Sequence, residues 1–174
     1  MASESNQPLT TMRTSADRRI VLEIRSWKFG YVVIEGHDLL EWGVCRFPSG
    51  GSTVAVRKFI RLVTMYPPSL VITRRTRRAK HRSVQGAKHL LQRLRQALKV
   101  RSIPLVVLSR TQVRSFFFRQ GYTNKHSVGQ AVAEHFERLK QRIPKARKPW
   151  DPERHIAVVF DAAATAIAFE ELQQ

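Results

Sequence analysis

The sequence predicts an α/β domain in which helices cover both faces of a mixed, five-stranded sheet. Three short apolar strands come first, at residues 19–25, 29–35 and 39–47, and links of only three residues separate them. Links this short join antiparallel neighbours. Two further apolar runs, 69–73 and 105–108, alternate with segments in which apolar residues recur at helical spacing. Antiparallel strands followed by alternating strands and helices are typical of a mixed sheet with helices on its faces.

The first strand carries two charges among apolar residues. Glu23 and Arg25 follow Ile20, Val21 and Leu22 in a strand that otherwise has the composition of a buried one. Side chains alternate between faces along a strand, so both charges point to the same face of the sheet. In the second strand, a glycine at position 30 predicts a bulge or a close approach of another backbone.

Five helices are expected in the rest of the chain. They are placed over 53–66, around the leucines at 90–98, after Thr111, after Asn124, and from Pro152 to Leu172. Pro67-Pro68 ends the first of them, because the residue before a proline disfavours the helical conformation. Thr111 and Asn124 are candidate N-caps, since their side-chain oxygens can accept hydrogen bonds from free backbone N–H groups.

The charge balance predicts a polyanionic partner. The 174 residues include 31 Lys and Arg against 13 Asp and Glu, a formal net charge of +18 with a pI near 11.4. Between Glu41 and Glu134, 92 residues contain no acid and 19 Lys and Arg. Ion pairs within that segment cannot neutralise it, whereas a phosphate backbone can, with release of its counterions. We therefore expect nucleic acid as the partner.

A basic tract follows the fourth predicted strand. Six positive charges fall within nine residues. The tract consists of Arg74, Arg75, Arg77, Arg78, Lys80 and Arg82, and Arg110, Arg114, Arg119 and Lys125 are expected to extend its surface. One interpretation is a solvated run of charges. The other is a set of phosphate contacts at the edge of the sheet, which give affinity and salt dependence without sequence readout.

Other function classes are disfavoured by composition. Residues 1–18 are polar and are expected to be a disordered leader rather than a signal peptide, followed by one domain over 19–174. No apolar run approaches the roughly 18 residues of a membrane span.

A single cysteine, Cys45, excludes an internal disulfide and favours the reducing cytoplasm, where we expect association with the nucleoid. The histidines lack zinc-ligand spacing, and Gly50-Gly51 lacks the Lys of a P-loop.

The predicted order of elements is the layout of the ribonuclease H-like fold, and within that fold the chain resembles the RuvC-type Holliday-junction resolvases. The stretch LEIRSWKFGYVVIE resembles the family's first hairpin, and FDAAATAIAFEEL resembles its last helix. The resemblance covers about residues 19–172. Positions that match motifs of the family are Gly30, Tyr31, Glu35, Val113, Arg114, Gly121, Lys125 and Val128.

The resemblance implies metal-dependent cleavage of DNA four-way junctions. About four carboxylates gather at the sheet edge in the family and hold two Mg²⁺ ions, which take oxygen ligands. The first-strand Asp of the family falls on Arg25, and the Glu that ends its fourth strand falls on Thr73 or Arg74. The two acids of its last helix fall on Asp161 and Ala164. One carboxylate of four is thus kept, and Glu23 lies about 7 Å down the strand from Arg25.

Three functions follow as alternatives. In the first, Arg25 pairs with Glu23, Asp161 or both, and the chain binds branched or structured DNA without most of the catalytic acids. No tightly bound cofactor is then expected, and the resemblance implies a possible homodimer. In the second, the chain is a divergent Mg²⁺-dependent nuclease that uses Glu23 and Asp161 with Glu35 or Glu41. In the third, the basic surface alone binds RNA.

Three consecutive aromatic residues, Phe116, Phe117 and Phe118, open a separate question. We expect two of them to enter the core and one to be exposed. Ordinary packing accounts for the buried pair. An exposed Phe either has no binding role or inserts between bases at a junction.

Overall fold

The sheet has five strands and mixed directions. The computed structural model describes residues 17–76, 82–145 and 154–173, without the side chains of 82–84. The strands are β1 (Arg18–Ile24), β2 (Lys28–Glu35), β3 (Asp38–Arg46), β4 (Leu70–Arg74) and β5 (Leu105–Leu108), in the spatial order β3-β2-β1-β4-β5. β1 pairs antiparallel with β2 and parallel with β4, β2 pairs antiparallel with β3, and β4 pairs parallel with β5. The predicted ribonuclease H-like sheet is confirmed.

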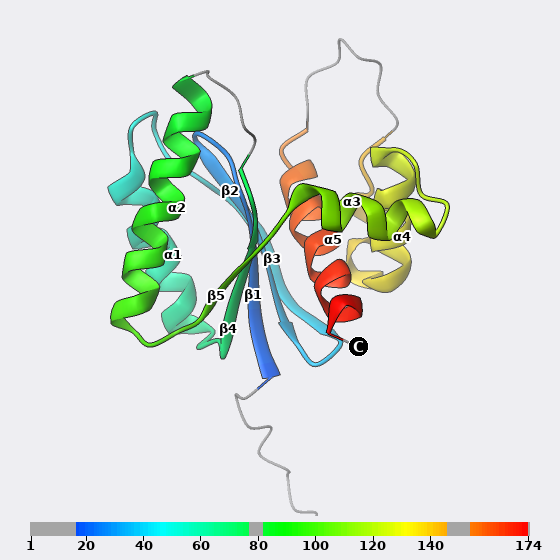
Figure 1. Ribbon diagram of the computed structural model, residues 1–174, viewed down its shortest axis with the longest axis horizontal. Helices are drawn as coiled ribbons and strands as arrows, with labels where there is room; N and C mark the ends of the chain where they lie inside the picture. Colours follow the sequence, from blue (N-terminus) through cyan, green and yellow to red (C-terminus); the bar gives the residue numbers. More distant parts are fainter. Residues whose placement is uncertain (1–16, 77–81, 146–153, 174) are drawn as a thin grey trace, which may run out of the picture.

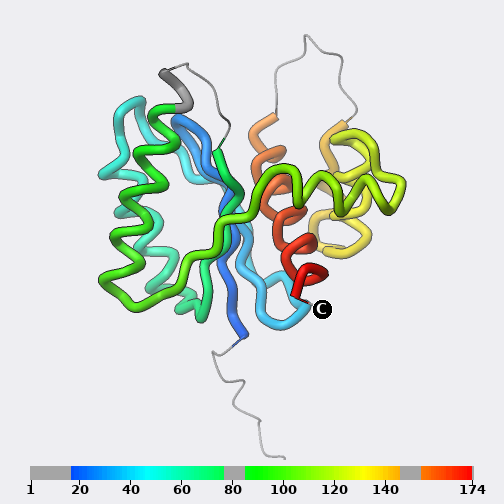
Figure 2. The backbone as a smooth tube through the Cα atoms, in the orientation of Figure 1, coloured from blue at the N-terminus to red at the C-terminus, as the bar shows by residue number. Residues whose placement is uncertain are grey.

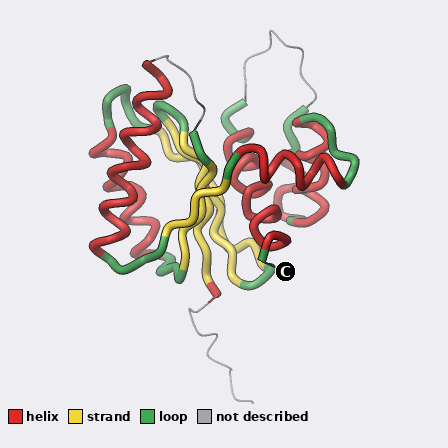
Figure 3. The backbone as a smooth tube through the Cα atoms, in the orientation of Figure 1, coloured by secondary structure: helices red, strands yellow, loops and turns green. Residues whose placement is uncertain are grey.

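Helices form a layer on each face of the sheet (Figure 1). On one face lie α1 (Ser52–Met65) and α2 (Arg82–Val100); on the other lie α3 (Arg110–Arg119), α4 (Lys125–His135) and α5 (Ala157–Leu172). Coloured by secondary structure, the sheet stands between two helical layers (Figure 3). Among the helices described, none is long and apolar enough to cross a membrane.

Alternation along β1 explains why its sequence is apolar on both faces. Ile20, Leu22 and Ile24 pack in the core beneath α1 and α2, whereas Val21 packs in the core on the α5 side. All four are at most 3 % exposed. A central strand covered by helices on both faces buries every residue, so it reads as a continuous apolar run. Glu23 follows Val21 on the α5 face by the same period of two.

Gly30 allows α5 to lie against the sheet. It stands opposite Glu23 in the β1–β2 register. A Cβ at this position would lie 2.5 Å from the carbonyl carbon and oxygen of Val158, the second residue of α5. The predicted close backbone approach is therefore confirmed, whereas the register irregularity lies elsewhere in β2, between Val33 and Ile34.

The last helix is the most buried of the helices described. Eleven of the sixteen residues of α5 are buried, five of them alanines, and small side chains let the helix pack closely between β1, β2 and the α3–α4 layer. At its far end, Arg19 Nη2 donates to Glu170 Oε1 at 2.9 Å. The C-terminal end of α5 accordingly lies beside the β2–β3 turn (Figure 2).

The helices differ from the prediction in three places: the cap of α3, the start of α5 and one additional 3₁₀ helix. Ser109, rather than Thr111, caps α3, and it forms a capping box with Gln112. Asn124 caps α4 as predicted, again with a capping box. α5 begins at Ala157, after a turn, and not at Pro152, which lies outside the described residues. A 3₁₀ helix, η2 (Glu137–Arg142), was not predicted.

Candidate functional site

An acid from the middle of the sheet and an acid from the last helix face the same site. Glu23 is 1 % exposed near the carboxyl end of β1. Asp161 lies in the second turn of α5, three residues after the Val158 backbone that contacts Gly30. Because Gly30 is the cross-strand neighbour of Glu23, the close approach of α5 brings the two acids to one place.

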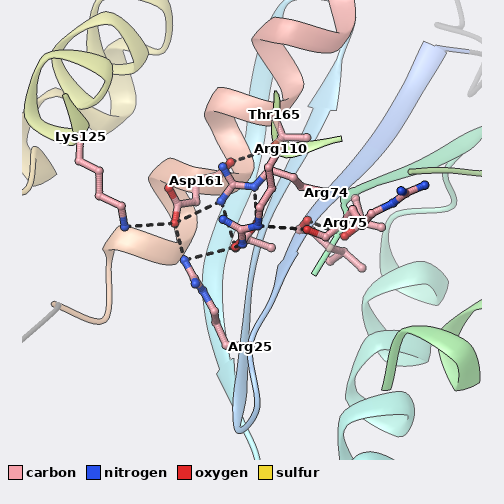
Figure 4. A network of polar contacts seen from close by, with 10 residues as sticks. Arg25, Arg74, Arg75, Arg110, Lys125, Asp161 and Thr165 are labelled. Atoms are coloured by element: carbon pink, nitrogen blue, oxygen red, sulfur yellow. Dashed lines mark hydrogen bonds and ion pairs between the residues drawn. The ribbon is translucent and has the colours of Figure 1, made fainter. Parts of the chain in front are cut away.

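Arg25 joins these two acids. Its Nη2 lies 2.7 Å from Asp161 Oδ2 and 3.2 Å from Glu23 Oε1. The predicted pairing of Arg25 is thus confirmed with both partners, and Figure 4 shows Arg25 pointing toward Asp161. Arg25 Nε is buried and, among the described residues, has no hydrogen-bond partner. One guanidinium therefore bridges both acids of the site.

Arg74 joins the same two acids from β4. Its Nε and Nη2 lie 3.1 and 3.0 Å from the two carboxylate oxygens of Glu23, a bidentate arrangement, and Nη2 lies 3.6 Å from Asp161 Oδ2. The sequence left Thr73 and Arg74 as alternatives for one position. Thr73 is fully buried and its hydroxyl donates to the Leu22 carbonyl oxygen at 3.0 Å, so Arg74 is the residue at the site.

Two further cations complete the group. Arg110 Nη2 lies 3.2 Å from Glu23 Oε1, and its Nε donates to the Arg75 carbonyl oxygen at 3.1 Å. Lys125 Nζ lies 3.8 Å from Asp161 Oδ2. We call the six side chains the ionic cluster: Glu23, Arg25, Arg74, Arg110, Lys125 and Asp161 (Figure 4). Four cations against two anions leave it with a net charge of +2.

The ionic cluster does not fit a pair of divalent metal ions. Metal ions of this kind need several oxygen ligands, and both carboxylates here already bind guanidinium groups. Ala164, at the position of the family's second helix acid, is buried in the apolar core. Within the described ranges, no three His, Cys, Asp or Glu side chains are placed to hold a metal ion.

The other acids considered for catalysis lie elsewhere. Glu35 pairs with Arg18, whose Nη2 lies 2.8 Å from Glu35 Oε1. It stands five residues along β2 from Gly30, about 16 Å at the rise of a strand. Glu41 is on β3, opposite Val33, and accepts from the backbone N–H of Trp42 at 2.8 Å. Neither completes a ligand set around Glu23 and Asp161.

The described part of the predicted basic surface lies beside the ionic cluster. Arg75 and Arg114 are exposed, and Arg110 and Lys125 belong to the cluster. Arg77, Arg78 and Lys80 lie outside the described residues, as does the side chain of Arg82. The three phenylalanines divide as expected: Phe116 and Phe117 are 6 % and 2 % exposed, whereas Phe118 is 61 % exposed.

Sequence reasoning missed Arg74 and Arg110 as partners of Glu23. Arg110 was assigned to phosphate contact only, and Arg74 to phosphate contact or to the position of the family's fourth-strand Glu. The alternation of β4 contained the signal for Arg74, because Ile72 belongs to the core on the α5 side and Arg74 follows it by two. No local sequence pattern could predict the contact of Arg110 with Glu23, because 87 residues separate the two.

Solved structures that are similar to this chain in fold include Holliday-junction resolvases. Thermus thermophilus RuvC in complex with a Holliday junction substrate has a TM-score of 0.65 and 13 % identity, over 89 % of this chain and 95 % of that one. Another Thermus thermophilus RuvC structure has a TM-score of 0.66 and 14 % identity, over 90 % of this chain and 96 % of that one. The yeast mitochondrial Holliday junction resolvase Ydc2 has a TM-score of 0.68 and 14 % identity, over 91 % of this chain and 79 % of that one.

Likeness in sequence is much weaker than likeness in structure. No family model matches the chain, and no curated protein matches it in sequence. The structural matches nevertheless span about nine tenths of the chain. The chain therefore has the fold of the RuvC-type Holliday-junction resolvases.

Proposed function

We propose that the chain binds branched or structured nucleic acid, with DNA favoured, and does not cleave it by the metal-dependent mechanism of RuvC-type resolvases. The observation that carries the proposal is the position of Arg25, whose Nη2 contacts both Asp161 and Glu23. A divalent ion bound by these carboxylates would have to displace Arg25 and Arg74. Displaced from their acids, two half-buried guanidinium groups beside a dication would be strongly disfavoured.

Charge supports the binding part of the proposal. The ionic cluster keeps a net charge of +2, and the exposed Arg75 and Arg114 adjoin it. A phosphodiester approaching this end of the sheet meets guanidinium and ammonium groups, which donate charge-assisted hydrogen bonds to phosphate oxygens. The likeness to a RuvC solved with a Holliday junction favours a branched substrate over a linear one.

The experiment that tests this proposal is competition binding in EDTA. A labelled four-way DNA junction is bound to the full-length chain and then displaced by unlabelled junction, linear duplex or structured RNA. We expect the junction to compete at least tenfold better than the duplex. Equal competition by all three would leave only unspecific phosphate binding, and preferential competition by RNA would assign the surface to RNA.

Charge-matched variants locate the contact surface in the same assay. Arg114→Gln combined with Lys125→Gln removes one exposed cation beside the ionic cluster and one cation of the cluster itself. Arg61→Gln combined with Lys99→Gln removes two exposed cations from α1 and α2, on the opposite face of the sheet. We expect junction affinity to fall in the first variant and to stay within about twofold in the second.

A homodimer is part of the proposal, because a two-fold symmetric assembly would present two such surfaces to a junction of matching symmetry. Light scattering of the free chain and of its junction complex measures the stoichiometry. Two chains per junction is the expected result. One chain per junction would remove the dimer from the proposal and leave the binding surface in place.

A further inference from the structure

The exposed side of α3 combines one aromatic ring with cations and hydroxyl groups. Six residues line an open hollow of about 600 Å³, a size common for ligand sites. We call them the α3 face: Arg110, Thr111, Arg114, Ser115, Phe118 and Arg119. Two rows spaced by four residues form it, namely Arg110–Arg114–Phe118 and Thr111–Ser115–Arg119, because such residues lie above one another on a helix.

Phe118 is exposed because the core side of α3 is already filled. Val113, Phe116 and Phe117 are buried, and the rings of Phe116 and Phe117 pack edge to face with centroids 4.9 Å apart. Phe118 follows them on the opposite side of the helix and is 61 % exposed. Five polar side chains share its hollow, so the ring does not belong to an apolar patch of the kind that docks a folded protein.

The composition of the α3 face matches a nucleotide whose base is unpaired. The face carries three arginines, two hydroxyl groups and no acid. Arginine and hydroxyl groups bind phosphate and sugar oxygens, and an aromatic ring stacks on a base of any identity. A base inside a duplex has both faces covered by its neighbours, so Phe118 can stack only on a base that is unpaired or at a branch point.

The α3 face continues directly from the ionic cluster. Arg110 stands at its first turn and contacts Glu23 at 3.2 Å. Phe118 lies eight residues further along the helix, about 12 Å away at 1.5 Å per residue. That length corresponds to about three stacked nucleotides at 3.4 Å each. A strand whose phosphates lie at the cluster can therefore follow α3 to the aromatic ring.

We propose that the α3 face is a binding site for unpaired nucleotides, in which Phe118 stacks on a base while Arg114 and Arg119 contact the adjoining phosphates. This inference rests on the proposed nucleic-acid binding and adds to it a class of ligand and a stacking residue. It predicts that the chain binds single strands, and junctions with unpaired bases at the branch point, through Phe118.

The test measures the affinity of the full-length chain for oligo(dT) and oligo(U) of 12 nucleotides, for a blunt linear duplex, and for a junction with two unpaired nucleotides. Phe118→Ala should weaken binding of the single strands and of that junction about 5- to 150-fold, the range of one lost stacking contact. Duplex affinity should change less than twofold, and Phe118→Trp should restore single-strand binding. Comparing oligo(dT) with oligo(U) distinguishes a preference for DNA from a preference for RNA.

The matched control is Met65→Ala, since Met65 is a 66 % exposed apolar residue on α1, in the other layer. It should change none of these affinities. An equal loss of duplex and single-strand affinity in Phe118→Ala, or no loss at unchanged thermal stability, would overturn the inference. Competition by polyglutamate as effective as oligo(dT) would also overturn it. Junction binding that persists while single strands are not bound would refute the α3 site alone and leave the proposed function standing.

Discussion

At the scale of single residues, two arginines hold the two acids of the site together. Arg25 and Arg74 each bind both acids of the ionic cluster. A buried carboxylate is costly unless it is paired and hydrogen-bonded, and Glu23, at 1 % exposed, meets three guanidinium groups. Glu23 and Arg25, the two charges of the first strand, thus form an ion pair with each other.

Removal of Glu23 should destabilise the fold. In Glu23→Ala, Arg25, Arg74 and Arg110 lose their shared anion and repel one another. We expect the free energy of unfolding, measured by urea denaturation, to fall by about 3–5 kcal/mol, as when one partner of a buried ion pair is removed. The control Glu171→Ala removes an exposed acid of α5 and should change stability by less than about 0.5 kcal/mol. Equal effects would mean that the cluster contributes no stability.

Acids restored at two positions should create a response to divalent ions. The double variant Arg25→Asp/Arg74→Glu gives the ionic cluster four carboxylates, with only Arg110 and Lys125 left as cations beside them. Repulsion among the four carboxylates should lower the melting temperature in EDTA, and Mg²⁺ or Mn²⁺ should raise it by several degrees through preferential binding to the folded state.

The unmodified chain serves as the comparison and should melt at the same temperature with EDTA and with Mg²⁺. An equally large Mg²⁺ response in the unmodified chain would show that its two acids bind the ion despite the arginines. Absence of any response in a folded double variant would show that the geometry of the site, and not its charge, excludes metal.

At the scale of elements, the site depends on how closely α5 lies against the sheet. Val158 contacts the backbone of β2 at Gly30, and this contact places Asp161 next to Glu23. The hydroxyl of Thr165 donates to the Asp161 carbonyl oxygen at 2.8 Å, which adds a contact within the same stretch of helix. Movement of α5 away from β2 would therefore separate the two acids.

Gly30→Ala tests this dependence. The new Cβ would lie 2.5 Å from the backbone of Val158, so α5 must shift, and overpacking of this kind costs about 1–3 kcal/mol. The matched control is Gly86→Ala in α2, where the nearest atom to a new Cβ is 3.8 Å away and the helix should gain about 0.5–1 kcal/mol. Urea denaturation measures both, and a neutral Gly30→Ala would contradict the proposed role of the contact.

The elements were largely predictable from the sequence, because they depend on local periodicity and on short links. All five strands and five helices were anticipated in order. The predicted cap of α3 was wrong by two residues. Ser109 and Thr111 both carry suitable hydroxyl groups, and only the capping box with Gln112 distinguishes them. The ion pairs of Asp161 could be guessed only through the family resemblance, because 136 residues separate it from Arg25.

At the scale of the whole molecule, charge is distributed for contact with a polyanion. The formal net charge is +18, and the ionic cluster and the α3 face stand together at one end of the sheet. The fold is shared with resolvases at 13–14 % identity. Fold alone does not decide function, and among the described residues both acids of the site are paired with arginines and lack the further oxygen ligands that a divalent ion needs.

Junction binding should weaken steeply with salt, because each neutralised phosphate releases counterions. Arg114→Gln should lower the slope of log K against log[salt] by about 1, as expected for one lost phosphate contact. Arg61→Gln, an exposed arginine on α1, should leave the slope unchanged. Titrations at several KCl concentrations provide the measurement, and a salt-independent affinity would contradict phosphate contact altogether.

The central claim, binding without metal-dependent cleavage, is tested most directly by incubation of a labelled four-way junction with the full-length chain in Mg²⁺, in Mn²⁺ and in EDTA. Bound and cut fractions are measured on native and denaturing gels. We predict equal binding in all three conditions and an intact junction throughout. Cleavage that requires the divalent ion and disappears in Asp161→Ala would contradict the claim and identify the chain as a divergent nuclease.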